Sequence, residues 1–410
     1  MRNTSIQNQI QGVDLTQIAA EFGTPVYVYD AEKITGQIRR LRNAFSRTNI
    51  RIKYAAKALT NISILKLIRS AGAEVEVVSL EEGAMALRAG YSPHEITFTP
   101  SGVDFIEIEE AVSSRFLINL DNLSSLRKFG KKYANKYPCG IRLNPGIMAG
   151  GNLKISTGHA SSKFGISIHQ LQEILSVVRE FDIQVSGLHI HTGSDILDPN
   201  VFLQMAEILF EAAKHFTALR FIDFGSGFKV AYKEGDKVTD IEDLGLKLSE
   251  VFNDFCVKYG RQLELWIEPG KFVVSESGTL LVQVNVVKPT PTITFAGVNS
   301  GLNHLIRPMM YDAYHHIDNI SNPSGPVTTY NIVGYICETD TFAADRAIQE
   351  IREGDILAFR NAGAYGFSMS SNYNSRLRPA EVLVINGKPR LIREREQIED
   401  LLRRQIVIDL

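Results

Sequence analysis

The chain has 410 residues, with 44 Lys and Arg against 46 Asp and Glu, so its formal net charge is −2. Hydrophobic residues at 44% and charged residues at 22% exclude a disordered chain, a coiled-coil rod and a collagen-like chain. The charge balance gives no basis for nucleic-acid binding, and no apolar run is long enough to span a membrane. The first residues lack a secretory pattern and predict a cytoplasmic location, while three separated cysteines predict neither a disulfide framework nor a Cys-based metal site.

Short apolar runs alternate with helical patterns between residues 31 and 275. We predict eight strands, at 50–56, 73–79, 95–99, 115–120, 140–144, 184–191, 220–224 and 263–269. Segments with apolar residues at helical spacing separate them, for example 63–72, 80–90, 167–181 and 201–216. Several of these segments end at a glycine suited to a helix C-cap, namely Gly72, Gly90 and Gly260. This alternation predicts an α/β fold with a (β/α)8 TIM barrel.

After about residue 275 the pattern changes to strands. Predicted strands lie at 278–287, 292–298, 328–338, 355–361, 380–385 and 389–394. Asn386-Gly387 joins the last two and predicts a hairpin turn. We therefore predict a barrel domain at 31–275 and a mainly β domain formed by 276–410 together with residues 1–30, whose segment 25–30 is expected to pair with it.

Polar side chains follow the predicted barrel strands at their C-terminal ends, where such barrels carry their active sites. Lys57 ends the first strand on the same face as Lys53, and a desolvated lysine near another cation should have a lowered pKa and attack a carbonyl. Glu268 ends the eighth strand, and a carboxylate there can keep a pyridine nitrogen protonated. The alternative for Lys57 is a buried lysine paired with Asp or Glu across the barrel. The alternative for Glu268 is an ion pair with Lys53 or Lys57.

Two turns and a pair of histidines add to this set. Gly225-Ser226-Gly227 follows the seventh strand, where backbone N–H groups are placed to bind a phosphate. Gly193-Ser194, after the sixth strand, is a second turn suited to a phosphate. His189 and His191 share a strand face, but no carboxylate or cysteine follows at metal-ligand spacing, so we predict no metal. An imidazole against an aromatic cofactor fits better, with a core histidine as the alternative for His189.

Seven motifs occur in the order typical of one enzyme family: KYAAKA (53–58), HIHTGS (189–194), DFGSG (223–227), EPGK (268–271), CETD (337–340), GAY (363–365) and YNSRLRPAEVLV (373–384). Over residues 20–405 the chain resembles the alanine-racemase-like, fold type III decarboxylases that depend on pyridoxal 5'-phosphate (PLP). The segment 144–166 is similar to a loop found in members that act on diaminopimelate. The resemblance implies PLP as the cofactor and a homodimer, in which the Cys-Glu segment reaches the barrel of the other subunit.

The resemblance also assigns roles to individual residues. It implies that Lys57 binds PLP covalently, that His191 stacks on its ring and that Glu268 holds its ring nitrogen. The implied phosphate contacts are Ser194, Gly225, Ser226, Gly227 and Tyr365. The implied substrate contacts are Lys271, Arg307, Tyr311, Glu338 and Tyr373. Cys337 is the implied proton donor, and its alternative is a small buried apolar residue.

Four positions depart from the family pattern. Lys271 stands where the family has arginine, so the bidentate fork of a guanidinium is lost. Ser226 replaces the middle glycine of a three-glycine turn and requires a backbone conformation that is not restricted to glycine. Asp195 stands where many relatives have glutamine, and CETD is one residue shorter than usual. The extra charge of Asp195 is expected either to favour a cationic substrate group or to be solvated.

The activity implied by the resemblance is decarboxylation of meso-2,6-diaminopimelate to L-lysine and CO2, the last step of lysine biosynthesis. We expect Lys53, Lys57, His191, Lys271 and Arg307 to converge on the anionic cofactor and a dicarboxylate substrate. The alternatives are the same reaction on ornithine, lysine, arginine or carboxynorspermidine, and a racemase, for which no second base is apparent. A different class is a catalytically silent, PLP-binding regulatory homologue.

Overall fold

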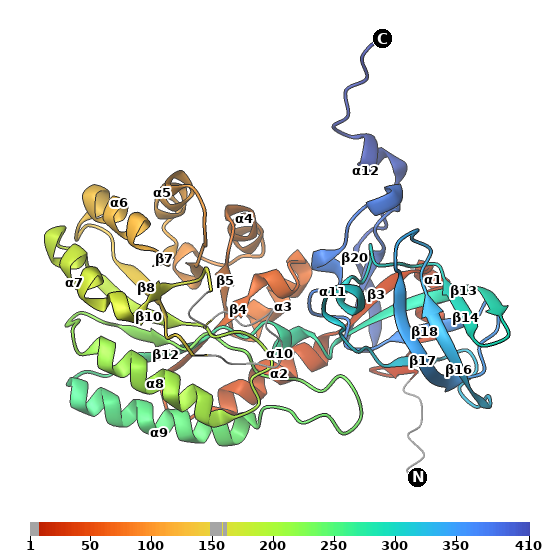
Figure 1. Cartoon of the computed structure of the whole chain (residues 1–410), viewed down its shortest axis with the longest axis horizontal. Coiled ribbons are helices and arrows are strands. Elements are labelled where there is room, and N and C mark those ends of the chain that lie inside the picture. The colour runs from red at the N-terminus through yellow and green to blue at the C-terminus, as the bar shows by residue number, and fades with distance from the viewer. Residues whose placement is uncertain (1–7, 148–157, 159–161) are drawn as a thin grey trace. The chain divides into compact units, whose positions relative to one another are not determined.

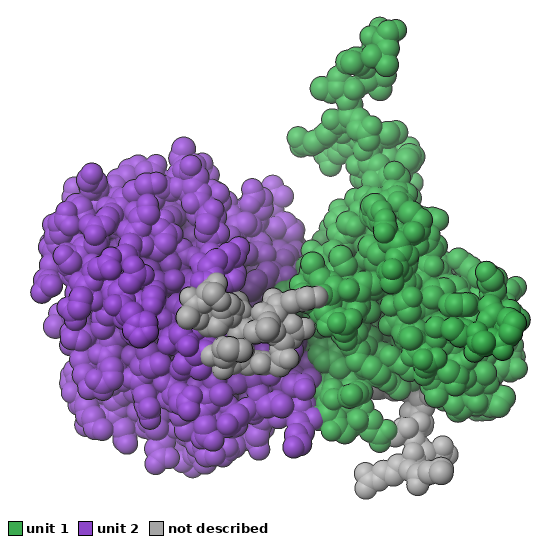
Figure 2. Space-filling view, in the orientation of Figure 1, with its two compact units in different colours: residues 1–34, 231–236, 274–410 green, residues 35–230, 237–273 purple. Residues whose placement is uncertain are grey.

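The computed structural model of the chain consists of two compact units (Figure 2). The structure describes residues 8–147, 158 and 162–410. Unit 1 comprises Met1–Ile34, Ala231–Asp236 and Val274–Leu410, and unit 2 comprises Thr35–Val230 and Lys237–Val273. Most of the predicted family loop at 144–166 lies outside the described residues.

Unit 2 is a closed barrel of parallel strands, which confirms the predicted fold class. Within the described residues the barrel strands are β4 (Ile50–Ala55), β5 (Glu74–Val77), β6 (Ile96–Phe98), β7 (Leu117–Leu120), β8 (Cys139–Asn144), β10 (Val185–Ile190), β11 (Phe221–Asp223) and β12 (Glu264–Ile267). The sheet closes because β12 pairs with β4 and β10 pairs with β8, all in parallel. A short β9 (Ile166–Ser167) pairs with β8. Each of the eight predicted strands is thus present; seven are shorter than predicted by one to three residues, and β8 begins one residue earlier, at Cys139.

Helices connect these strands and lie outside them (Figure 1). They are α2 (Ala31–Ala44), α3 (Ile62–Ser70), α4 (Leu80–Arg88), α5 (Phe105–Ser113), α6 (Leu123–Tyr133), α7 (Leu171–Glu180), α8 (Pro199–Ala213), α9 (Ile241–Tyr259) and α10 (Lys271–Val274), with 3-10 turns η1 (Ala56–Ala58), η2 (Pro93–Glu95) and η4 (Ile168–Gln170). Side-chain oxygens cap several N-termini, as Asn61 does for α3 and Ser79 for α4. Gly260 caps α9 in the left-handed conformation, with φ 77°, as its position in the sequence predicts.

Inside the barrel, Lys53 of β4 is completely buried. Its ammonium pairs with the carboxylate of Glu74, the neighbour of Lys53 in register on β5. It also lies 4.1 Å from the ring centroid of Trp266, which stacks on Phe221 with 3.6 Å between centroids. The expectation that Lys53 joins Lys57 at the cofactor is therefore wrong, because Lys53 is held by a carboxylate and an aromatic ring of its own.

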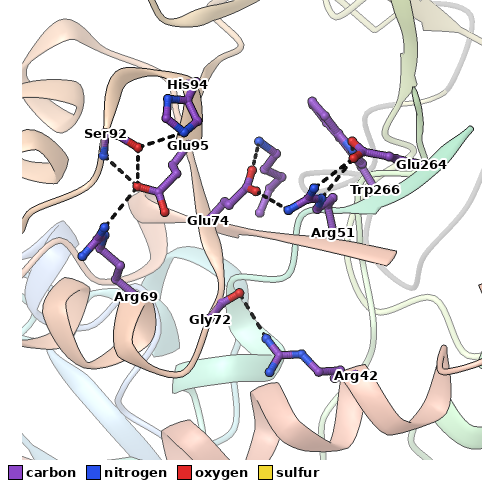
Figure 3. A network of polar contacts seen from close by, with 11 residues as sticks. Arg42, Arg51, Arg69, Gly72, Glu74, Ser92, His94, Glu95, Glu264 and Trp266 are labelled. Carbon is purple, nitrogen blue, oxygen red and sulfur yellow. Dashed lines mark hydrogen bonds and ion pairs between the residues drawn. The ribbon is translucent and has the colours of Figure 1, made fainter. Parts of the chain in front are cut away.

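We expect Lys53→Ala to lower the free energy of unfolding by about 3–5 kcal/mol, since it breaks a buried ion pair and leaves a cavity. Arg51→Ala is the matched control, because the Arg51 side chain is 48% exposed where it contacts Glu74 and Glu264 (Figure 3). That variant should cost less than about 1 kcal/mol. Urea unfolding followed by circular dichroism measures both, and equal losses for the two variants would contradict this account.

Unit 1 is built mainly from strands, as predicted. They are β1 (Gln9–Ile10), β2 (Val13–Asp14), β3 (Val26–Asp30), β13 (Gly278–Pro289), β14 (Thr294–Val298), β15 (Ile317–Asn319), β16 (Val327–Val333), β17 (Thr341–Gln349), β18 (Ile356–Phe359), β19 (Ala380–Ile385) and β20 (Lys388–Arg393). The main sheet has the order β17-β16-β14-β13-β3-β19-β20, and β18 pairs with β13 and β15. Short helices accompany the strands: α1 (Leu15–Phe22), α11 (Arg307–Tyr311), α12 (Ile398–Leu402), η5 (Phe367–Met369) and η6 (Tyr373–Ser375).

Three predictions about unit 1 can be compared with these strands. The segment at 25–30 does pair with the C-terminal β segments, since β3 lies between β13 and β19. Asn386 and Gly387 have φ of 53° and 66° and form the predicted turn between β19 and β20. The strand predicted at 328–338 is wrong at its end, because β16 stops at Val333 and leaves Cys337 in the connection to β17.

No helix among the described residues combines the length and the apolar character needed to cross a membrane.

Candidate active site

Lys57 lies in η1, directly after β4, at the C-terminal end of the barrel strands. Its Nζ donates a hydrogen bond of 2.9 Å to Oε2 of Glu76, which is buried on β5. Burial raises the pKa of Glu76 to about 7; the charge of Lys57 acts against this shift and that of Glu268 adds to it. Lys57 thus pairs with a carboxylate, as its alternative expected, but the partner lies on the neighbouring strand β5 rather than across the barrel, and the Lys57 side chain is 38% exposed rather than buried.

Sequence reasoning assigned no role to Glu76, although a signal was present. In the run AEVEVVS the two glutamates alternate with apolar residues, so Glu74 and Glu76 share one face of β5. Because the apolar residues of a barrel strand pack against the helices, both carboxylates are directed to the interior, where they meet Lys53 and Lys57.

Glu268 follows β12 and is buried among groups from two neighbouring strands. Nε2 of His189, on β10, lies 3.1 Å from Glu268 Oε2. Burial raises the pKa of Glu268, but the contact with His189 and the charge of Lys57 outweigh it and bring that pKa well below its usual range. Burial also lowers the pKa of His189, so its ring is neutral and donates from Nε2. Among its described residues the structure contains no ion pair from Glu268 to Lys53 or Lys57, so this alternative for Glu268 is wrong.

His191 lies just beyond β10, next to the turn after β11. Its Nδ1 accepts a hydrogen bond of 3.3 Å from the backbone N–H of Ser226. Burial, followed by the charges of Arg142 and Lys57, lowers the pKa of His191 to about 3, so the imidazole is neutral. A neutral, flat ring whose orientation is fixed by a backbone hydrogen bond is suited to stacking on an aromatic cofactor.

The two glycine-containing turns lie against each other. The Ile196 N–H donates to the Gly227 carbonyl at 2.9 Å, and Ile196 and Phe228 form an isolated parallel bridge. A Cβ at Gly227 would lie 2.3 Å from the carbonyl oxygen of Gly193, and the φ of Gly227 is 122°. This position therefore requires glycine, whereas Ser226 has no positive φ, as its side chain predicts.

Lys271 and Asp195, two of the departures from the family pattern, form an ion pair. Lys271 Nζ donates to both carboxylate oxygens of Asp195, at 2.9 and 3.1 Å. Asp195, whose side chain is 26% exposed, is thus paired within the chain, and the expectation that its charge favours a cationic substrate group stays a prediction. Because Asp195 follows the Gly193-Ser194 turn, the pair ties that turn to the start of α10.

Arg142, on β8, is buried in the same region, although sequence reasoning assigned it no role. Its guanidinium carbon lies 4.9 Å from the ring centroid of Phe164. Burial lowers the pKa of Arg142, while Glu268 is the largest influence that raises it. The available signal in the sequence was that Arg142 is a polar residue on the inward face of a predicted barrel strand.

The other predicted site residues belong to unit 1. Arg307 begins α11 and is buried, and its Nη2 donates to the hydroxyl of Tyr232 at 3.2 Å. The Nε of Arg307 has no hydrogen-bond partner among the described residues. Tyr311 ends the same helix, and Tyr365 has a left-handed backbone with φ 56°.

A second group in unit 1 contains the predicted proton donor. Tyr373 donates from its hydroxyl to Glu338 Oε1 at 2.9 Å. Asn374 Nδ2 lies 3.4 Å from the sulfur of Cys337, which is exposed. The alternative that Cys337 is a small buried apolar residue is therefore wrong for this chain.

A family profile described as "Pyridoxal-dependent decarboxylase, pyridoxal binding domain" matches residues 31–275. The chain belongs to this family. Among the pyridoxal-dependent decarboxylases it is 38% identical to a diaminopimelate decarboxylase of Methanothermobacter thermautotrophicus, over 97% of this chain and 95% of that protein. A crystal structure of a diaminopimelate decarboxylase matches with a TM-score of 0.89 and 34% identity, covering 98% of both chains. A Helicobacter pylori diaminopimelate decarboxylase in complex with L-lysine matches with a TM-score of 0.87 and 32% identity, over 95% of this chain and 98% of that one.

Membership of the family implies PLP, and two features of this pyridoxal-dependent decarboxylase fit that cofactor. Glu268 Oε1 is buried and has no partner among the described residues, so a buried acceptor is available for a protonated ring nitrogen. Gly193 and Gly227 approach so closely that no side chain fits between the turns, which leaves backbone groups to face a phosphate. The cofactor requires an ionised carboxylate beside its ring nitrogen and donors for its phosphate, and Glu268 and the two turns are suited to these requirements.

Proposed function

We propose that this chain decarboxylates meso-2,6-diaminopimelate at its α-carbon and releases L-lysine and CO2. The observation that carries the proposal is the buried carboxylate of Glu268 in one barrel with Lys57 and the two glycine turns. When bound, PLP supplies an electron sink for the electron pair left on the α-carbon after CO2 departs. We interpret the group of His189, Asp223 and Glu268 as the nitrogen site of this cofactor rather than a metal site.

In the proposed reaction the barrel residues hold the cofactor and its protons. Lys57 Nζ provides the covalent attachment and exchanges with the substrate amine. Glu268 remains ionised and so favours a proton on the ring nitrogen. The neutral His191 would lie against the ring, and Ser194 with Gly225, Ser226, Gly227 and, from unit 1, Tyr365 would bind the phosphate. Lys271 contributes a positive charge near the Gly193-Ser194 turn, and Asp195 partly neutralises this charge.

For the substrate, we assign the distal carboxylate to Arg307 with Tyr311, and the distal ammonium to Glu338 with Tyr373. A buried guanidinium with an unpartnered Nε favours an anionic group, because a buried charge is costly unless it is paired. Cys337 is assigned as the proton donor to the α-carbon. We further propose that the protein is a cytoplasmic homodimer. Sedimentation of the purified chain would measure the mass of this dimer.

The substrate is tested by CO2 release from meso-diaminopimelate, ornithine, lysine, arginine and carboxynorspermidine, with and without added PLP. We expect PLP-dependent release of CO2 from diaminopimelate. The kcat/KM for this substrate should be on the order of 10⁴-fold higher than for amino acids without a distal carboxylate. Faster turnover of another diamino acid would contradict the substrate. A yellow, PLP-loaded protein that releases CO2 from none of them would support the silent homologue instead.

Arg307→Ala tests the distal contact. We expect kcat/KM for diaminopimelate to fall by roughly a thousandfold, since the distal carboxylate loses its buried partner. The PLP content, read from the visible band, should be unchanged because Arg307 is assigned to substrate alone. Steady-state kinetics measures the first effect, and an unchanged kcat/KM would make the assignment of Arg307 wrong.

Glu76→Gln tests the effect of the contact between the Glu76 carboxylate and the Lys57 ammonium. Because the Glu76 carboxylate favours the ammonium form of Lys57, the variant should raise the rate of PLP binding by roughly tenfold above pH 7. The advantage should fade as the pH falls below 7, since Glu76 itself becomes protonated there, with a pKa of about 7. Stopped-flow absorbance measures the rate. Glu74→Gln is the control, because Glu74 pairs with Lys53, and an equal effect in both variants would contradict the proposal.

A further inference from the structure

Three buried side chains from adjacent strands meet in the barrel: His189, Asp223 and Glu268. Asp223 is the last residue of β11, which lies between β10 and β12 in the sheet. It is paired in register with His189 on one side and with Trp266, two residues before Glu268, on the other. Polar atoms of the three groups lie within 4.8 Å of one another. Asp223 therefore stands between the other two, and the proposed reaction assigns the ring nitrogen to Glu268 but gives Asp223 no separate role.

The backbone fixes both carboxyl groups. Asp223 Oδ1 accepts from the N–H of Gly225 at 2.9 Å, and the N–H of Glu268 donates to the Gly225 carbonyl at 2.7 Å. Glu268 Oε2 is in contact with His189 Nε2 at 3.1 Å. One oxygen of each carboxyl then remains, Asp223 Oδ2 and Glu268 Oε1, and both are buried without another partner among the described residues. One proton held by Asp223 satisfies both oxygens, and the second lone pair of Glu268 Oε1 is left for the ring nitrogen of PLP.

We propose that Asp223 is a positioning residue: its carboxyl is neutral and donates a hydrogen bond to Glu268, holding that carboxylate in place opposite His189. The inference rests on the proposed function, because the positioned group is the one assigned to the ring nitrogen of PLP. Asp223 itself acts only through Glu268.

The charges around Asp223 agree with this arrangement. Burial, then the charge of Glu268, raises the pKa of Asp223 well above its usual value. The Gly225 N–H and the ammonium of Lys53 act in the opposite direction but are outweighed. Two carboxylates this close in a dry interior do not both ionise, and the one bonded to His189 and nearer to Lys57 keeps the charge.

A neutral carboxyl has a close mimic in asparagine, which gives a matched pair of variants. In Asp223→Asn the amide oxygen can accept from Gly225 and the amide nitrogen can donate to Glu268, so both contacts are retained. Asp223→Leu has a similar volume and loses both contacts. If Asp223 instead served as an ionised partner of Lys53, the asparagine variant would lose the essential charge and resemble the leucine variant.

The test combines infrared spectroscopy with PLP binding on the full chain. The infrared difference between wild type and Asp223→Asn should contain the band of a protonated carboxyl, both with PLP bound and without it. The dissociation constant of PLP should stay within about twofold of wild type in Asp223→Asn and rise by roughly tenfold or more in Asp223→Leu. Absence of the band, or equal weakening in both variants, would overturn the proposal.

The infrared readout needs neither substrate nor turnover, so the two proposals fail separately. A chain that shows the carboxyl band but decarboxylates no amino acid would keep the role of Asp223 as the partner of Glu268 and refute the proposed function. A chain that decarboxylates diaminopimelate without the band would do the reverse. Asp223→Asn also remains informative if Asp223→Leu fails to fold, since it preserves the contacts of the native side chain.

Discussion

Lys57→Ala is expected to lower decarboxylation of diaminopimelate by on the order of a thousandfold or more, because it removes the amine that attaches the cofactor and exchanges with the substrate. The purified variant should also lack the visible band that borohydride abolishes in the wild type. Lys57 follows a barrel strand, its side chain is 38% exposed, and it donates to Glu76 at 2.9 Å, so its removal should leave the rest of the barrel intact. Steady-state kinetics and the absorbance spectrum measure both effects.

Two controls make this result specific to the amine. Added methylamine should restore part of the activity of Lys57→Ala, since a free amine can replace the missing Nζ. Lys33→Ala removes another lysine, whose contact with Glu276 lies in unit 1, and should leave the activity unchanged. A yellow Lys57→Ala protein with wild-type turnover would mean that a different lysine binds the cofactor.

Glu268→Gln should lower kcat by on the order of 10²–10⁴, since a neutral amide no longer favours a proton on the ring nitrogen. Glu268→Asp keeps the charge on a shorter side chain and should lose less. The low pKa of Glu268 adds a pH expectation: the wild-type carboxylate stays ionised through the neutral range, so no loss of kcat between pH 8 and 5 should arise from its protonation. Kinetics across that range measures this, and a kcat of Glu268→Gln equal to wild type would contradict the role.

The fold was predictable because its signal is local. Buried parallel strands appear as apolar runs, and Asn386-Gly387 specifies its turn regardless of what surrounds it. The end of β16 was not predictable in the same way. The residues after Val333 have strand composition, but Gly334 donates its N–H to the Asp340 carbonyl and closes a loop that the pairing with β17 determines.

The site was predictable where a residue follows a strand, and not where its role depends on a partner. Lys57 and Glu268 could be named as candidates from strand ends, while the assignment of His191 came from the family resemblance. That Lys53 contacts Glu74, that Lys57 contacts Glu76 and that Asp195 contacts Lys271 depends on which strands are neighbours and in what register. The sequence shows which residues share a strand face, but the register across the sheet selects their partners.

The central claim is that Lys57 holds PLP in this barrel for decarboxylation, and one measurement tests it most directly. The PLP-loaded protein is reduced with borohydride, digested, and its peptides are analysed by mass spectrometry, once alone and once during turnover of meso-diaminopimelate. The account predicts the pyridoxyl group on the peptide containing Lys57 in the resting protein, and a marked decrease of that label when substrate is present. A label on another lysine, or a Lys57 label that diaminopimelate leaves unchanged, would contradict it.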